Sequence, residues 1–327
     1  METANHRKIV ILVTGGTILC SFDEVNHEVI PNVPADEILN GIKKHGSGNK
    51  IVVSEFSNVP SPHLSLEMGE KLAEEARNIL KKDDVRGLVV VQGTDVLEEI
   101  AYLFHLVLDT PKPVVFTGSM KNRDDLYSDY RGNIDGAIRI IESEEAAGRG
   151  VMVYFNQEIH SANYIEKENT NNVASFKSPQ FGPIGVVYND KVEFLGRVEP
   201  AKHYKPMKLD SNVQIIRATY SMNDLLLRAC IREGVPGVVI EGLGAGNVPP
   251  NLIPAIKDAL SSGMAVVLTS RCHTGHVIGT YGYEGGGAEL VRLGVINGKN
   301  LGGIKARIRL IVLLGMQSCA DYLNKEF

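Results

Sequence analysis

Residues 87–108 read GLVVVQGTDVLEEIAYLFHLVL and decide the fold class of the chain. Residues 87–91 form a short apolar run rich in valine, which is typical of a strand buried on both faces of a sheet. After a polar turn, residues 96–108 carry apolar side chains at i, i+3 and i+4, the spacing of a helix that covers such a sheet. A strand that runs directly into a helix predicts a parallel sheet.

The same alternation extends along most of the chain. In the first half, further strands are expected at 8–13, 51–55, 113–117 and 150–155, and further helices at 66–82 and 131–143. In the second half, strands are expected at 213–217, 236–241 and 264–269, and helices at 221–232, 250–262 and about 303–316. Residues 161–191 favour hairpins at the edge of the first sheet, and residues 282–288 favour a turn or a mobile loop. The fold class is therefore α/β, with two open parallel sheets.

A segment without periodicity separates the two halves. Residues 196–212 read GRVEPAKHYKPMKLDSN, with two prolines and scattered charges, which is typical of a linker. We therefore expect a larger N-terminal domain at 1–195, a linker at 196–212 and a smaller C-terminal domain at 213–327. A length of 327 residues is enough for about two ordinary domains.

Charge and composition exclude several classes of protein. The chain has 34 Lys and Arg against 39 Asp and Glu, a net charge of −5, so it lacks the basic field that a nucleic-acid partner requires. The apolar run at 9–13 is too short for a signal-peptide core or a membrane span, so we expect a cytoplasmic protein that does not bind membranes. The cysteines are far apart, which indicates reduced thiols: Cys20, Cys230, Cys272 and Cys319.

Two turns at the ends of predicted strands are candidate binding sites, because ligands of open α/β sheets bind beyond the carboxyl ends of the strands. The first is Thr14-Gly15-Gly16-Thr17-Ile18, where two glycines let the backbone turn sharply and leave N–H groups open beside hydroxyls. The second is Gln92-Gly93-Thr94-Asp95, where Thr94 lies at a helix N-terminus and Asp95 could either cap the helix or accept a ligand ammonium group. Taken singly, each turn could also be an ordinary capped connection.

Five ordered motifs together resemble the bacterial-type asparaginase/glutaminase family over nearly the whole chain. They are TGGTI at 14–18, GTD with LEE at 93–99, VVFTGSM at 114–120, KENT with VASFKS at 167–178, and EGLGAGN at 241–247. The resemblance implies a larger, flavodoxin-like N-terminal domain and a smaller C-terminal domain. It also implies a homo-oligomer, either a dimer or a tetramer, that acts on a small amino-acid amide.

The resemblance implies a two-step hydrolysis of a side-chain amide, without a metal or an organic cofactor. It places the nucleophile at Thr17, which would form an acyl-enzyme as ammonia leaves. Thr94, Asp95 and Lys167 would form the proton relay, since Asp95 can hold the lysine while a partly desolvated lysine takes and returns a proton. Backbone N–H groups around Gly93 and Thr94 would hold the oxyanion.

Further residues are implied to bind the substrate. In the first domain these are Gly16, Ser61, Gly93 and Asp95, although Ser61 could equally be a turn serine between two prolines. Asn247 lies in the second-domain turn that the resemblance assigns to the family. Glu284 lies in a second-domain loop that, in this family, reaches the site of a neighbouring subunit.

The chain departs from the family pattern at three places near the expected site. Gln92 and Val96 replace the usual histidine and threonine, and Pro62 replaces a glutamine that contacts the α-substituents of the substrate. Residues 20–33 contain no tyrosine, although the family carries an activating tyrosine on this loop. Candidates for its replacement are His27, Glu28, Tyr281 and Tyr283.

Three functions therefore stay open: an asparaginase, a hydrolase of a different amide such as glutamine, a D-amino acid amide or a modified asparagine, and a binding protein that has lost catalysis. Two other motifs are weaker indications of a binding site. His273 and His276 are interpreted as loop histidines, because no carboxylate stands at a metal-ligand spacing. The glycines at 242, 244 and 246 lack the spacing of a dinucleotide site.

Overall fold

The computed structural model describes residues 7–40, 42, 48–196, 198, 202–209, 212–316 and 320–327. The chain divides into two compact units, Met1–His203 and Tyr204–Phe327. The expected linker at 196–212 includes this division, and part of it lies outside the described residues. Each unit is an α/β structure, which confirms the fold class, while the exact domain and linker bounds stay a prediction.

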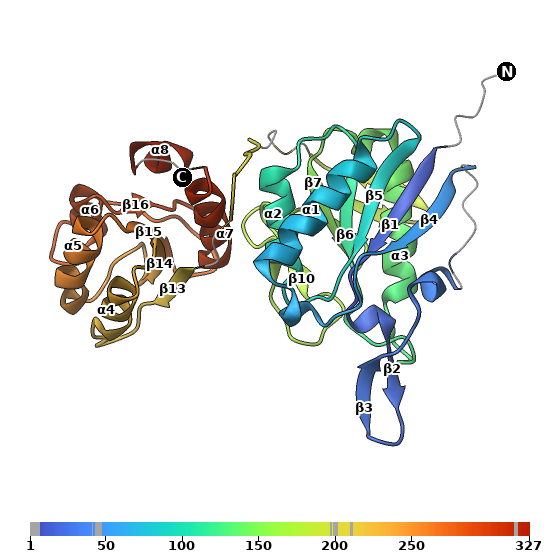
Figure 1. Cartoon of the computed structure of the whole chain (residues 1–327), viewed down its shortest axis with the longest axis horizontal. Helices are drawn as coiled ribbons and strands as arrows, with labels where there is room; N and C mark the ends of the chain where they lie inside the picture. Colours follow the sequence, from blue (N-terminus) through green and yellow to red (C-terminus); the bar gives the residue numbers. More distant parts are fainter. Residues whose placement is uncertain are drawn as a thin grey trace. The chain divides into compact units, whose positions relative to one another are not determined.

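The first unit is built around an eight-stranded sheet (Figure 1). Five neighbouring strands run parallel, in the order β4 (Lys50–Glu55), β1 (Lys8–Val13), β5 (Val85–Val91), β6 (Val114–Thr117) and β7 (Val151–Phe155). Numbered along the chain, this order is second, first, third, fourth, fifth, the flavodoxin-like order. Beyond β7 the sheet continues through the antiparallel strands β8 (Glu158–Ser161), β11 (Gly185–Tyr188) and β12 (Lys191–Phe194).

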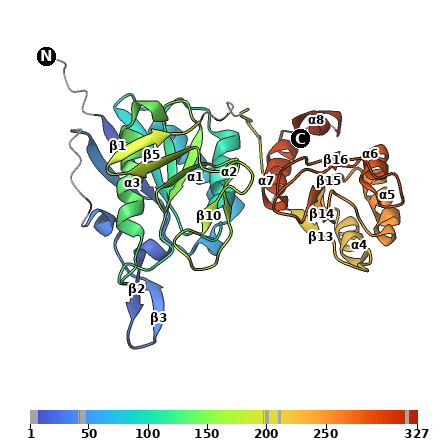
Figure 2. The same ribbon diagram turned by 180° about the vertical axis from the view of Figure 1, so that it is seen from behind.

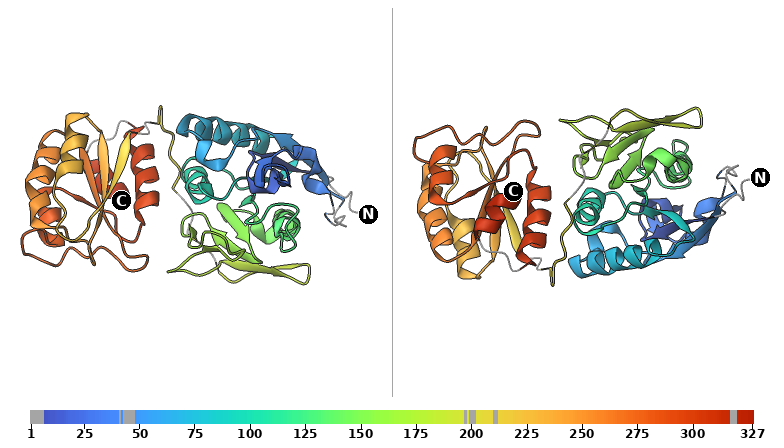
Figure 3. Two further views of the ribbon diagram at one scale, coloured as in Figure 1. Left: turned by 90° about the horizontal axis from the view of Figure 1, so that it is seen from below. Right: turned by 90° about the horizontal axis from the view of Figure 1, so that it is seen from above.

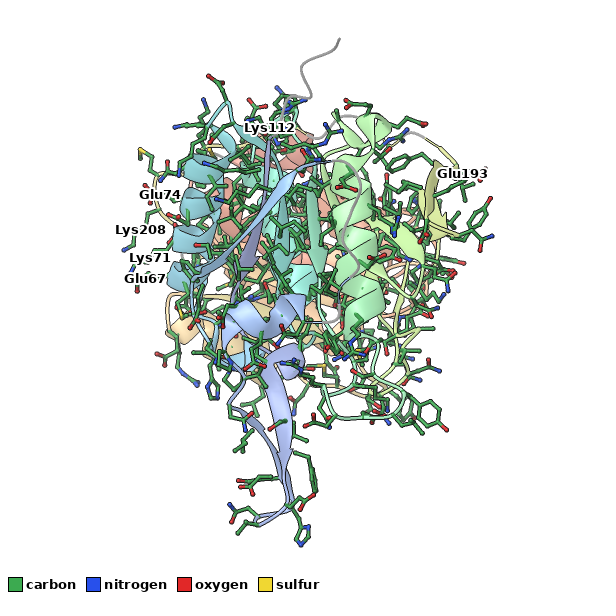
Figure 4. All side chains as sticks on the ribbon, turned by 90° about the vertical axis from the view of Figure 1, so that its right-hand side faces the viewer. Glu67, Lys71, Glu74, Lys112, Glu193 and Lys208 are labelled. Carbon is green, nitrogen blue, oxygen red and sulfur yellow. The ribbon has the colours of Figure 1, made fainter. Side chains whose placement is uncertain are left out.

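Helices cover both faces of this sheet. The helices α1 (Leu66–Leu80) and α2 (Leu97–Val107) contact each other, and α3 (Tyr130–Glu142) packs on the opposite face against Ile9 and Ile11. The sequence of α1 explains its orientation, because its apolar positions are buried while Glu67, Lys71 and Glu74 lie on its outer side (Figure 4).

Two small sheets lie outside the large one. The hairpin of β2 (Cys20–Asp23) and β3 (Glu28–Pro31) projects from the first unit in the views of Figure 1 and Figure 2. The strands β9 (Glu166–Lys167) and β10 (Phe176–Lys177) pair antiparallel with each other. The expectation that residues 161–191 form hairpins at the edge of the first sheet therefore holds for β11 and β12 but is wrong for β9 and β10.

The second unit contains four parallel strands in chain order: β13 (Val213–Arg217), β14 (Gly237–Gly242), β15 (Ala265–Ser270) and β16 (Ile296–Asn297). Its helices are α4 (Leu225–Arg232), α5 (Ile253–Ser261), α6 (Gly287–Leu293), α7 (Gly303–Leu314) and α8 (Ala320–Glu326). Figure 3 shows helices on both sides of this sheet. The helix α7 contacts β13 and β14, and α4 packs on α5.

The structure corrects several local expectations. The helix expected at 221–232 begins only at Leu225, with Asp224 as its N-cap, and Ser221 lies before it with a φ of 57°, outside the range of a right-handed α-helix. The loop expected at 282–288 ends in the first turn of α6. Within the described ranges, no helix is long and apolar enough to cross a membrane. Cys20, Cys230 and Cys272 are free thiols, and Cys319 lies outside the described residues.

Candidate active site

Three turns meet at the carboxyl ends of β4, β1 and β5, three neighbouring strands of the large sheet. Gly16 follows β1 with a φ of 97°, and a Cβ atom there would lie 2.3 Å from Gly93 Cα. A Cβ atom on Gly93 would in turn lie 2.9 Å from Ser61 Cβ. Glycine is therefore required at both positions, because the backbones of the turns pack directly against each other.

These turns form the floor of a pocket of about 460 Å³. Six of the expected site residues line it: Gly16, Thr17, Ser61, Gly93, Thr94 and Asp95. Thr17 lies in the short 3-10 turn Thr17–Leu19 and is partly buried. Thr17 lines the pocket, and its hydroxyl has no hydrogen-bond partner in the described part of the chain.

Lys167 is the centre of the expected relay. Its Nζ donates to Thr94 Oγ1 at 2.9 Å and to Asp95 Oδ1 at 2.7 Å, although the lysine lies more than seventy positions further along the chain. The lysine side chain is 15% exposed and that of Asp95 61% exposed. One face of the Asp95 carboxylate thus pairs with Lys167 while much of the group stays accessible to a ligand.

The structure excludes one of the two roles considered for Asp95, that of a helix cap. The N-cap of α2 is Val96, and no side chain caps this helix. The carboxylate of Asp95 pairs with Lys167, so it is not a helix cap. Its backbone N–H donates to Ser61 Oγ at 3.1 Å, which ties the turn after β5 to the turn after β4. Ser61 therefore supports the turn and lines the pocket as well.

The segment that carries Lys167 is anchored on its other side to the large sheet. Lys177 of β10 donates to Glu158 Oε2 at 2.6 Å, and Ser178 Oγ lies 3.0 Å from Nδ1 of the fully buried His160. Burial lowers the pKa of His160 to about 4, although the nearby Glu158 opposes the shift. The histidine is therefore neutral at neutral pH.

Sequence reasoning missed the opposite wall of the pocket. Met120 and Lys121 line this wall, and their backbone N–H groups both donate to the carboxylate of Asp129. The Ser119 hydroxyl donates to the same carboxylate at 2.7 Å. Lys121 Nζ then donates to Asn171 Oδ1 at 2.8 Å, joining this wall to the loop after β9. The motif VVFTGSM at 114–120 was the available signal, because it ends at this wall.

The other expected residues lie outside this pocket. In the second unit, Asn247 Oδ1 accepts the Gly287 N–H at 3.2 Å and so shapes the turn after β14. Glu284 is exposed in the loop before α6, between Tyr283 and the helix. In the first unit, His27 lies at the tip of the β2–β3 hairpin with a φ of 54°, next to Glu28 at the start of β3.

Two further expectations concern metals and departures from the family. His273 and His276 are exposed in the loop after β15, and the described residues contain no group of three or more His, Cys, Asp or Glu side chains able to hold a metal ion. Gln92 is completely buried behind the pocket floor, whereas Pro62 lines the pocket itself. Of the two substitutions, Pro62 is the one that a substrate would touch.

Comparisons with known proteins identify the family of the chain. Residues 8–199 match the family described as asparaginase, N-terminal, and residues 212–327 match the glutaminase/asparaginase C-terminal domain. The L-asparaginase of Bacillus licheniformis is 32% identical over 309 residues, covering 94% of this chain and 96% of that protein. A probable L-asparaginase of Deinococcus radiodurans is 32% identical over 324 residues, covering 98% and 97%.

A solved structure gives the same result for the fold. The crystal structure of a probable cytoplasmic L-asparaginase from Campylobacter jejuni superimposes with a TM-score of 0.87 at 27% identity, covering 98% of each chain. The two family matches together span almost all of the sequence. This chain therefore belongs to the asparaginase family.

Proposed function

We propose that the protein hydrolyses the side-chain amide of L-asparagine to L-aspartate and ammonia. The observation that carries this proposal is that Lys167 Nζ bridges Thr94 Oγ1 and Asp95 Oδ1, two residues that line the same pocket as Thr17. Membership of the asparaginase family and the resemblance to L-asparaginases support the choice of substrate.

In the first step, Thr17 Oγ attacks the carbon of the side-chain amide and forms a tetrahedral intermediate. Its proton passes to a base, and the ammonia that leaves takes up a proton in turn, so that an ester of Thr17 remains. Lys167, once its ammonium group has given up a proton, would act as this base through the Thr94 hydroxyl to which Nζ is hydrogen-bonded. Backbone N–H groups at Gly93 and Thr94 would stabilise the oxyanion.

In the second step, water takes the place of the departed ammonia. Thr94 and Lys167 accept a proton from this water as it attacks the ester, and the proton returns to Thr17 Oγ as aspartate leaves. Thr94 and Lys167 thus serve both steps. The buried position of Thr94 and its hydrogen bond to Lys167 favour this double use. No step requires a metal ion or an organic cofactor.

Substrate recognition follows from the charges of the pocket. The accessible part of the Asp95 carboxylate suits the α-ammonium group, and the Ser61 hydroxyl suits the α-carboxylate. Pro62 offers no side-chain donor at the pocket wall. This observation favours a second candidate function, hydrolysis of a related amide whose α-substituents differ from those of L-asparagine.

We also propose the assembly, the domains and the location. The N-terminal domain, 1–195, would carry the catalytic threonines, and the C-terminal domain, 213–327, would supply Asn247 and Glu284 to a site shared between subunits of a dimer or tetramer. The separate family matches at 8–199 and 212–327 support a division of the chain into two domains. The likeness to a probable cytoplasmic asparaginase supports a cytoplasmic location.

The test is ammonia release from L-asparagine, L-glutamine and D-asparagine at neutral and mildly alkaline pH, with Thr17→Ala measured alongside. We expect L-asparagine to be the best substrate and Thr17→Ala to abolish release. A strong preference for another amide would establish the second candidate. A protein that L-asparagine or L-aspartate protects from melting, without any ammonia release, would be a binding protein and would contradict both.

A further inference from the structure

Glu98 is a buried carboxylate that the reaction described above does not use. It lies in the first turn of α2, is 8% exposed, and forms no ion pair with any described residue. Burial of a carboxylate is costly unless strong hydrogen bonds compensate for the lost water. The N-terminus of a helix offsets part of this cost, because its dipole favours negative charge.

Among the described residues, the partner of this carboxylate is the backbone of the relay lysine. Glu98 Oε2 accepts the backbone N–H of Lys167 at 2.8 Å. An acidic residue in the first turn of a helix can fold back to cap its own helix. The side chain instead reaches across to β9.

The geometry of β9 explains why this contact matters. The strand has two residues and pairs on one side with β10, where the Glu168 N–H donates to Ser175 O at 2.8 Å. In an antiparallel pair, N–H groups of successive residues point to opposite sides. The Lys167 N–H therefore points away from β10, and Glu98 takes the place that a third strand would occupy.

Residues 93–98, the turn after β5 with the first turn of α2, form a corner of the fold that holds Lys167 at both of its ends. Thr94 and Asp95 hold the ammonium group, and Glu98, in the helical turn that follows, holds the backbone nitrogen. A lysine side chain has four rotatable bonds, so fixing its Cα relative to its acceptors lowers the entropy cost of keeping Nζ in place. Both attachments belong to residues 94–98, so the distance between them does not depend on loop motion.

We propose that Glu98 is a positioning residue: its carboxylate fixes the backbone of Lys167 so that Nζ stays on Thr94 and Asp95. The inference rests on the proposed function, because it assigns a role through the lysine of that relay. The hydrogen-bond acceptor does the positioning, and the charge is secondary. Glu98 contacts the backbone of Lys167 and takes no part in proton transfer itself.

The test compares kcat and KM for L-asparagine in five full-length proteins: wild type, Glu98→Gln, Glu98→Asp, Glu98→Leu and the control Glu99→Gln. The glutamine keeps an acceptor at the same reach and should stay within about threefold of the wild-type kcat. The aspartate is one methylene shorter and the leucine has no acceptor, so kcat should fall on the order of tenfold to a hundredfold. KM should change by less than about threefold, because the substrate contacts remain.

Glu99→Gln removes a carboxylate from the same helical turn and should leave kcat and KM unchanged. If Glu98→Leu does not fold, as its melting curve would show, the comparison of Glu98→Asp with Glu98→Gln decides. Folded Glu98→Asp with wild-type kcat would overturn the proposal, as would a loss of kcat in Glu98→Gln equal to that in Glu98→Asp.

The variant Lys167→Met tests the proton relay independently of the positioning role of Glu98. If this variant is inactive while folded Glu98→Asp and Glu98→Leu keep the wild-type kcat, only the positioning role of Glu98 fails. If Lys167→Met keeps the wild-type rate, the relay itself is wrong, whatever the Glu98 variants do.

Discussion

Two segments that border the pocket differ in how firmly the fold holds them. The corner at 93–98 is packed against other turns, and both Thr94 and Glu98 are buried. The β2–β3 hairpin, four positions after Gly16, exposes apolar side chains, with Val25 at 86% and Val29 at 45%. Two long hydrogen bonds, each of 3.3 Å, join it to the loop after β6.

The proposed reaction depends on the segment that the fold holds more firmly. The residues proposed for proton transfer belong to the firm corner or are bonded to it, and these match the family pattern. The missing tyrosine falls in the exposed hairpin, where a change costs the fold little. The proposed reaction can therefore be kept while the exposed hairpin beside the pocket changes, and the predictions below test this division.

The largest expected effect concerns Lys167, whose side chain is bonded to Thr94 and Asp95 of the corner. Lys167→Met should lower kcat by about a thousandfold, since it removes the base and leaves the oxyanion donors in place. The melting temperature should change little, because Asp95, the ion-pair partner of the lysine, is 61% exposed and can be solvated. Steady-state ammonia release and a thermal melt measure both quantities, and wild-type kcat in a folded variant would remove Lys167 from the relay.

The second effect concerns the glycine floor. Gly16→Ala should yield little folded, active protein, because the new Cβ would meet Gly93 Cα at 2.3 Å and the φ of 97° disfavours any L side chain. Gly132→Ala is the matched control, since a Cβ there meets nothing within 4 Å. Thermal melts of both variants test the prediction, which a Gly16→Ala protein with the wild-type melting temperature would contradict.

The third effect is a pH dependence of stability at the anchor of β10. The pKa of His160 is lowered to about 4 from 6.5, mainly by burial, so below pH 6.5 the unfolded chain binds a proton that the folded chain does not. Stability is therefore fully present above pH 6.5 and falls as the pH drops towards 4. Glu158, Lys177 and Ser178 surround this histidine.

Melting temperatures of the wild type and His160→Gln between pH 7.5 and about 4 measure this effect. The wild type should lose more stability over this range than the variant, which cannot take up the proton. Parallel curves would show that His160 does not titrate as described.

The smallest effect concerns the hairpin. Asp23 accepts the side-chain N–H of Asn26 at 2.7 Å and the backbone N–H groups of Val25 and Asn26, and these bonds lower the pKa of the Asp23 carboxyl. All of these contacts lie within the hairpin, so Asp23→Ala should leave the melting temperature of the protein unchanged within error. A clear drop would show that the hairpin is coupled to the fold as firmly as the corner, and the comparison would fail.

Most of the large sheet could be predicted from the sequence, because its strands are short apolar runs followed by helical periodicity. The bounds expected at 8–13 and 213–217 are those of β1 and β13. The hairpin at 20–31 was missed, since its charged and polar residues carry no clear alternation and its pairing depends on the turn at His27.

The candidate site was predictable for a different reason. Thr94 and Asp95 lie next to each other in the sequence, but only the motif resemblance indicated that Lys167 joins them. Glu98 and Asp129 could not be assigned, because each acts through a backbone N–H group whose direction depends on tertiary structure. Side-chain identity at these positions predicts a helix start or a surface loop and gives no sign of the partner.

The most direct test of the central claim is the site of acylation. The wild-type protein is mixed with L-asparagine, quenched in acid during turnover, digested and examined by mass spectrometry. The account predicts an aspartyl group on the peptide that contains Thr17. An aspartyl group on the peptide that contains Thr94, or unchanged ammonia release by Thr17→Ala, would contradict it.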